Sequence, residues 1–106
     1  MYANISNAAR KAIYRREGFA CALCGNPKHL QVHHVLKRSQ GGKGNPQNLI
    51  CLCAQCHALV HGTFKYPEGY ITKEDAELAI IEYLADYYAP DWDPRPYGAR
   101  GAQSGA

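Results

Sequence analysis

Residues 19–61 decide the fold and read FACALCGNPKHLQVHHVLKRSQGGKGNPQNLICLCAQCHALVH. They contain two CxxC pairs, Cys21 with Cys24 and Cys53 with Cys56, separated by 28 residues. Each pair can bend around one ion so that both thiolates reach it, and four sulfurs form a closed structural zinc site. Such an ion has no open position for water. The sequence therefore assigns this zinc to folding and not to catalysis.

Two residues of this stretch are assigned ordinary structural roles. Cys51 has no CxxC partner and is expected to be a small buried apolar residue. His29 lies in the turn after the first pair, and a lone histidine is more often structural than a ligand. A redox role for either CxxC pair is disfavoured, because neither has the strand-then-helix setting that a thioredoxin-like motif needs.

Four histidines follow a pattern that predicts a second site. His33 and His34 end an expected strand, while His57 and His61 lie four apart on an expected helix that starts beside Cys56. Residues four apart share a helix face, so strand and helix can converge on one point. Adjacent strand residues face opposite sides, so we expect the strand to end or bulge at the histidine pair and re-aim one imidazole.

The length and composition are consistent with metal-supported folding. A chain of 106 residues forms one domain with a small core, and five cysteines with five histidines indicate that metal supports it. No apolar segment is long enough for a secretory h-region or a membrane span. We therefore expect a cytoplasmic protein with no membrane partner, in which thiols stay reduced.

Charge is distributed unevenly along the chain. Residues 1–45 hold eight Lys and Arg against one acidic residue, whereas residues 46–106 hold four against eight. A polyanionic partner would meet the first half, although unevenly scattered solvated charges explain the count equally well.

Local patterns predict an α+β domain over residues 1–89, with its core at 19–62, and a flexible tail at 90–106. The N-terminal helix is capped by Ser6, and the long C-terminal helix begins at a capping box of Thr72 and Asp75. The expected elements are a helix over 6–17, a strand over 30–35, a Gly-rich loop over 37–47, a strand over 48–52, a helix over 54–61 and a helix from 72 onward.

The segment 19–61 resembles the HNH endonucleases, which have a ββα-metal (His-Me finger) core and often carry two flanking CxxC pairs. The resemblance rests on the HH pair, the Gly-rich loop, Asn48 before an apolar strand, and CxxCH with a further histidine four residues on. It covers about two fifths of the chain. It implies one catalytic divalent ion beside the structural Zn²⁺ of the four cysteines.

Residue by residue, the resemblance makes His34 the general base and His33 a metal ligand. Asn48 either orients the base loop or contributes a ligand, and its alternative is an ordinary turn residue. His57 falls on a ligand position, and His61 on a position that is a ligand in some members. Many members have Asp where this chain has His33, so the softer site is expected to accept Mn²⁺, Ni²⁺, Co²⁺ or Zn²⁺ besides Mg²⁺.

The resulting hypothesis is a metal-dependent DNA endonuclease of low sequence specificity that produces 5′-phosphate and 3′-hydroxyl ends. It would be a monomer or a weak homodimer, and it would act either as a nickase or, as a dimer, by cutting both strands. One rival is a non-catalytic zinc module that binds nucleic acid or protein, and another is an RNA substrate. Small HNH proteins often belong to phages or prophages, where some work beside the terminase or another recognition partner, and others are restriction-like or mobile-element enzymes. The predicted phosphate contacts are Arg10, Arg15, Arg16, Lys37, Arg38 and Lys43.

Overall fold

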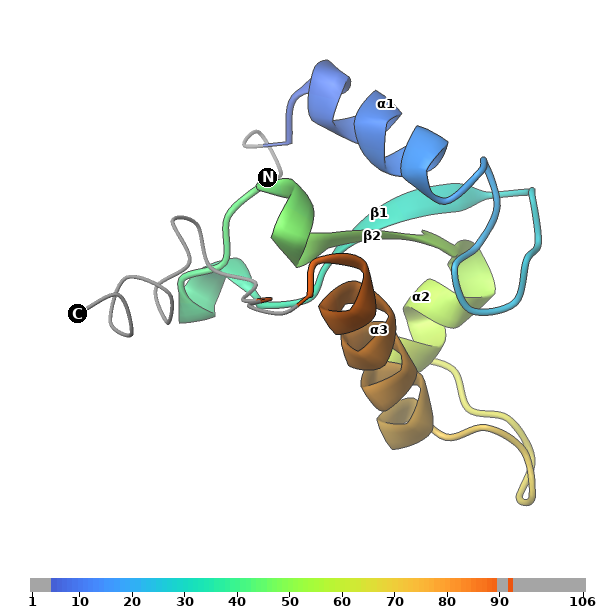
Figure 1. The fold of residues 1–106 in the computed structure, drawn as a ribbon. Helices are drawn as coiled ribbons and strands as arrows, with labels where there is room; N and C mark the ends of the chain where they lie inside the picture. The colour runs from blue at the N-terminus through green and yellow to red at the C-terminus, as the bar shows by residue number, and fades with distance from the viewer. Residues whose placement is uncertain (1–4, 90–91, 93–106) are drawn as a thin grey trace.

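The computed structural model describes residues 5–89 and residue 92, apart from the side chain of Arg38. It is a small α+β fold, as predicted, built on a two-stranded sheet with helices around it (Figure 1). The elements in chain order are α1 (Asn7–Arg16), β1 (Leu30–His34), the 3-10 turns η1 (Arg38–Gln40) and η2 (Pro46–Asn48), β2 (Leu49–Cys53), α2 (Ala54–His61) and α3 (Lys73–Tyr87).

The sheet is a regular antiparallel pair. Leu30 faces Cys53 and His34 faces Leu49, with each residue between them paired in turn. Val35 continues the pairing by donating its N–H to Asn48 O at 2.8 Å. The strand therefore ends at the histidine pair, as one alternative expected, but it has no bulge there.

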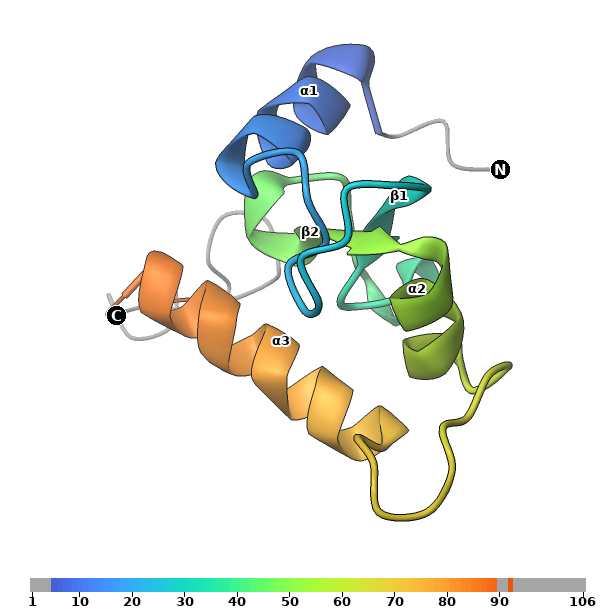
Figure 2. The same ribbon diagram turned by 90° about the vertical axis from the view of Figure 1, so that its right-hand side faces the viewer.

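Strand β2 is apolar throughout because both of its faces are covered. Leu49 and Cys51 pack with Ile13 of α1, and Ile50 and Leu52 pack with the buried residues of α2 and α3. Figure 2 shows α1 on one side of the sheet and α3 on the other. A continuous apolar run is typical of such a strand, and Cys51 has no exposed surface, as its assignment to the core required.

The helix ends follow the local signals of the sequence. Ser6 caps α1 by accepting a hydrogen bond from Ala9 N at 3.0 Å, and Gly62 ends α2 with a φ of 82°. Both hydrogen bonds of the Thr72 and Asp75 capping box are present at the start of α3. These predictions are confirmed.

The guanidinium of Arg16 is used inside the protein, which corrects its predicted DNA contact. Arg16 pairs with Glu17 at 2.6 Å, and their side chains are 5% and 1% exposed. Arg16 also donates to Leu49 O at 2.6 Å and to the Tyr88 hydroxyl at 2.8 Å. A guanidinium engaged in this way cannot also reach a phosphate.

Glu17 completes this connection between the two ends of the chain. Its carboxylate accepts from Cys51 N at 3.0 Å and from the Tyr83 hydroxyl at 2.8 Å. Burial and this bond to the carboxylate raise the pKa of Tyr83 to about 12. The end of α1 thus holds β2 and α3 together, and both buried charges are satisfied.

Trp92 is the one residue of the predicted tail at 90–106 that the structure describes. Trp92 donates from its indole Nε1 to Gln47 O at 2.9 Å. The rest of the predicted tail at 90–106 lies outside the described residues.

Within the part of the chain that the structure describes, no helix combines the length and apolar character needed to cross a bilayer.

Candidate metal centres and active-site cavity

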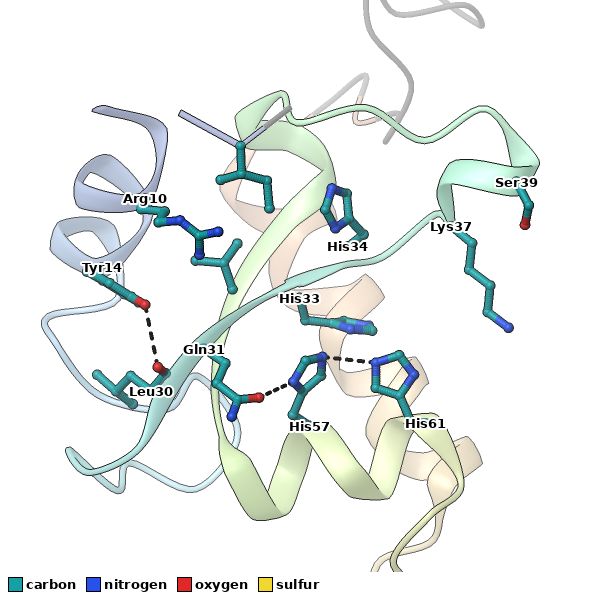
Figure 3. Close-up of a pocket in the computed structure, with 12 residues that line it drawn as sticks. Arg10, Tyr14, Leu30, Gln31, His33, His34, Lys37, Ser39, His57 and His61 are labelled. Atoms are coloured by element: carbon teal, nitrogen blue, oxygen red, sulfur yellow. Dashed lines mark hydrogen bonds between the residues drawn. The ribbon is translucent and has the colours of Figure 1, made fainter. Parts of the chain in front are cut away.

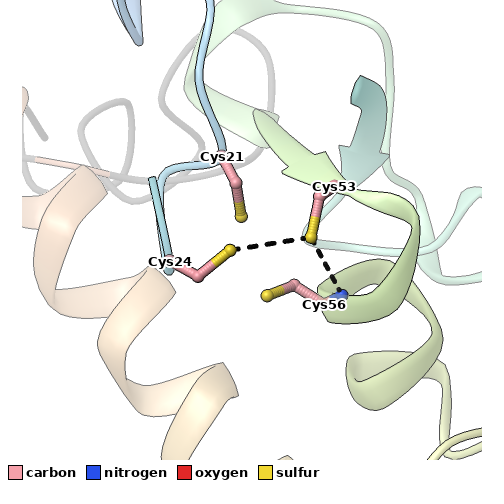
Figure 4. Close-up of side chains that lie close together, drawn as sticks. All are labelled: Cys21, Cys24, Cys53 and Cys56. Carbon is pink, nitrogen blue, oxygen red and sulfur yellow. Dashed lines mark hydrogen bonds between the residues drawn. The ribbon is translucent and has the colours of Figure 1, made fainter. Parts of the chain in front are cut away.

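The four cysteines of the CxxC pairs converge. Their Sγ atoms all lie within 4.8 Å of one another, and those of Cys24 and Cys53 are 3.7 Å apart. Figure 4 shows the first pair approaching from the turn after α1 and the second from the junction of β2 and α2. Two segments far apart in the sequence thus meet at one ligand set.

The electrostatics of this cluster fit a bound cation. Burial raises the pKa of the Cys56 thiol, and the neighbouring Cys21 raises it further. Burial also raises the pKa of the Cys24 thiol. Four clustered thiols cannot readily lose their protons together without a positive charge between them, and a divalent ion supplies that charge.

His33, His57 and His61 form a second cluster. One ring nitrogen from each lies within 4.8 Å of the others, and the Nε2 atoms of His57 and His61 are 2.9 Å apart. The rings from β1 and α2 point toward one another (Figure 3). The three ring nitrogens are close enough together for one divalent ion to be shared among these side chains.

Two histidines of the cluster have lowered pKa values, which favours the neutral form that ligates a metal. Burial, then the charges of His57 and His61, lower the pKa of His33 to about 3. Burial and His61 also lower the pKa of His57. A neutral imidazole has the free lone pair that a metal needs, so both side chains are ready to ligate near neutral pH.

Gln31 is a part of this site that the sequence analysis missed. Its Oε1 is hydrogen-bonded to Nδ1 of His57, the ring nitrogen that does not face His61 (Figure 3). Gln31 precedes His33 by two residues, so both side chains leave the same face of β1. This two-residue spacing from His33 was the signal in the sequence that could have identified Gln31 as part of the site.

His34 lies on the other side of β1 from His33 (Figure 3). Because β1 runs without a bulge through both residues, their side chains point in opposite directions. His34 nevertheless lines the same cavity as the three-histidine cluster, since the cavity extends past the strand toward α1. The structure thus separates the proposed base from the proposed ligands within one cavity.

Asn48 holds the loop by hydrogen bonds and is not part of the cavity lining. Its side chain is fully buried, with Oδ1 accepting from Leu36 N at 2.6 Å and Nδ2 donating to Leu36 O at 3.1 Å and to Lys43 O at 2.9 Å. The segment that follows His34 is therefore held by this amide. Of the two roles that the resemblance left open, the geometry favours the orienting one.

Gly42 allows this loop to close, and a side chain there is expected to open it. A Cβ at Gly42 would lie 1.8 Å from Leu36 O and 2.9 Å from Asn48 Nδ2. We expect Gly42→Ala to lower the free energy of unfolding by about 1–3 kcal/mol, because the backbone at Leu36 must move. Thermal melting checks this. Gln40→Ala, at an exposed loop residue, is the control, and equal melting temperatures for the two variants would contradict the prediction.

The cavity beside the histidines has a volume of about 630 Å³, and its lining includes the cations Arg10 and Lys37. These cations lie on opposite sides of the histidine cluster (Figure 3). Arg15 and Lys43 are exposed outside the cavity, and the side chain of Arg38 lies outside the described part of the chain. Of the predicted phosphate contacts, the structure thus brings Arg10 and Lys37 to the site.

Comparison with known proteins agrees with this geometry. Residues 21–63 match the model of the HNH endonuclease family. A 37-residue stretch, 35% of this chain, is 46% identical to the type IV methyl-directed restriction enzyme EcoKMcrA of Escherichia coli K12 and covers 13% of that protein. A stretch of 55 residues, 50% of this chain, is 34% identical to Anaredoxin of Nostoc sp. PCC 7120 and covers 71% of it.

The matched segment contains both clusters and the strands that position them. It begins at Cys21 and extends just past His61, so it holds every residue of the two ligand sets. The helices α1 and α3 lie outside it. The chain belongs to the HNH endonuclease family.

Proposed function

We propose that this protein is a metal-dependent DNA endonuclease that hydrolyses phosphodiester bonds to 5′-phosphate and 3′-hydroxyl ends. One observation carries the proposal. Three histidines of an HNH domain converge at a cavity that also contains a fourth histidine and two cations. This is the arrangement expected of a hydrolytic metal site with a nearby base.

The side chains of the cavity have distinct proposed roles. His33, His57 and His61 would hold one divalent ion, which would stabilise negative charge on the phosphoryl oxygen and on the leaving 3′ oxygen. His34 accepts the proton of the attacking water, since a neutral imidazole is a suitable base near neutral pH. The Asn48 amide keeps the backbone after His34 in place.

The cations position the backbone of the substrate. Arg10 and Lys37 inside the cavity, and Arg15 and Lys43 outside it, would contact phosphates. Such contacts carry no base information, so we propose a low sequence specificity. We also propose that the protein acts as a nickase, since the described part of one chain holds one histidine cluster. A recognition partner, such as a phage terminase, would supply further sequence choice.

Cleavage of supercoiled plasmid tests the proposal. The purified protein is first stripped of its more weakly held ion with a mild chelator, and Mg²⁺, Mn²⁺, Ni²⁺, Co²⁺ or Zn²⁺ is then added singly. We expect nicked circles with at least one metal, and none with His57→Ala, which lacks one proposed ligand. Circular dichroism and zinc analysis show that both proteins are folded.

A folded, zinc-loaded wild type that cuts no plasmid with any metal would contradict the nuclease proposal. The remaining hypothesis would then be a non-catalytic zinc module that binds nucleic acid or protein through the same basic surface. Gel-shift measurements on the same plasmid would test that alternative directly, since phosphate contacts predict binding that weakens as salt rises.

A further inference from the structure

We propose that Gln31 is a positioning residue that determines which nitrogen of His57 faces the metal. The inference rests on the proposed function, because it concerns the same histidine site. The Gln31 carbonyl oxygen would hold the proton on Nδ1 of His57 and so leave the Nε2 lone pair free for the ion. Gln31 itself would touch neither the ion nor the substrate.

The contacts of His57 support this assignment from both sides of its ring. Nδ1 contacts the Gln31 carbonyl oxygen, whereas Nε2 points to His61 Nε2 at 2.9 Å (Figure 3). A carbonyl oxygen can only accept, so Nδ1 must carry the hydrogen in this bond. A neutral imidazole has one N–H, and Nε2 is therefore the nitrogen with the free lone pair.

The fold explains how the side chain of Gln31 reaches His57. Gln31 pairs with Leu52 near the end of the sheet where α2 begins, so its side chain reaches the first turns of that helix. The backbone of β1 thus holds both a ligand, His33, and the group that orients another ligand, His57. Partners of this kind fix the tautomer and ring orientation of metal-binding histidines, and their loss typically weakens metal binding about 10–100-fold.

Substitutions at Gln31 separate this role from a general structural one. Gln31→Leu keeps a side chain of similar size but removes the acceptor, and we expect the affinity for Ni²⁺ at the histidine site to fall about 10–100-fold. Gln31→Glu retains an acceptor and should keep the wild-type affinity or exceed it. Gln55→Leu makes the same change at an exposed residue of α2 and is the matched control.

Two measurements without DNA test the inference. Calorimetric titration of zinc-loaded protein with Ni²⁺ gives the affinity, and His57→Ala identifies the histidine site as the one titrated. Long-range ¹H–¹⁵N spectra of His57 report its tautomer, which should carry hydrogen on Nδ1 in wild type and Gln31→Glu. In Gln31→Leu we expect a mixture of the two tautomers.

The outcomes distinguish this inference from the proposed function. Wild-type Ni²⁺ affinity and an unchanged His57 tautomer in Gln31→Leu would overturn the role of Gln31 and leave the nuclease proposal intact. Weakened Ni²⁺ binding in Gln31→Leu, together with a wild type that cuts no plasmid, would support the role of Gln31 and overturn the nuclease. A wild type without Ni²⁺ binding at the histidines would overturn both.

Discussion

Cys56→Ser is expected to leave most of the protein unfolded at room temperature. Cys56 is buried at the start of α2, and its thiol is one of the four that converge. Structural zinc sites contribute an apparent binding free energy of about 10–16 kcal/mol. Since small domains are stable by only about 5–15 kcal/mol, impairing this site should remove most of the stability.

The same cluster connects segments that have few other reasons to stay together. Cys21 and Cys24 hold the turn after α1 against the junction of β2 and α2. That junction also sets the direction of α2 and hence of His57. We therefore expect Cys56→Ser to lose its second metal site as well as its fold, because the histidine ligands no longer converge.

Far-UV circular dichroism and metal analysis check this prediction. After a mild chelator has removed any ion from the histidine site, we expect one zinc per wild-type chain, and we expect a largely disordered spectrum for Cys56→Ser. Cys51→Ala is the control, since it removes another buried thiol outside the cluster and should cost only about 1–2 kcal/mol. A folded Cys56→Ser with the wild-type melting temperature, or iron in place of zinc in the wild type, would contradict the assignment.

His34→Ala is expected to abolish most of the nuclease activity while the protein stays folded. General base catalysis typically contributes about 10²–10⁴-fold to a rate, and this factor should be lost from kcat. His34 stands outside the cluster of His33, His57 and His61, so Ni²⁺ binding should remain at the wild-type level. Unchanged metal binding with lost cleavage is the signature of a base and not of a ligand.

Plasmid nicking rates of wild type, His34→Ala and His29→Ala provide the measurement. His29 is exposed in the turn before β1, so its replacement tests the loss of a histidine outside the cavity. We expect wild-type rates for His29→Ala. A His34→Ala protein that cuts within about twofold of wild type would assign the proton transfer to another group and remove the main catalytic role proposed here.

Much of the fold was predictable because its signals are local. Ser6, Gly62 and the Thr72–Asp75 capping box mark helix ends through contacts within a few residues. The apolar run of β2 indicated a buried strand, and the CxxC spacing indicated a metal-binding cluster. The spacing of His57 and His61 placed both on one face of a short helix.

Other features depend on contacts between distant segments, which spacing in the sequence does not encode. Arg16 looked like one more cation of a basic helix, but its guanidinium contacts Tyr88, 72 residues away. Gln31 looked like an ordinary polar strand residue until α2 brought His57 against it. Asn48 could orient the loop, contribute a ligand or be an ordinary turn residue, and its hydrogen bonds to Leu36 favour the orienting role.

The sequence by itself therefore determined most of the elements, the four-cysteine cluster and the family, because these depend on residue type and short spacing. The tertiary structure alone decided the directions of the adjacent histidines, with His33 facing α2 and His34 on the other side of an unbulged strand. It also decided which cations reach the cavity. The physical reason is that side-chain direction and burial are set by the packing of α1, α2 and α3 around the sheet.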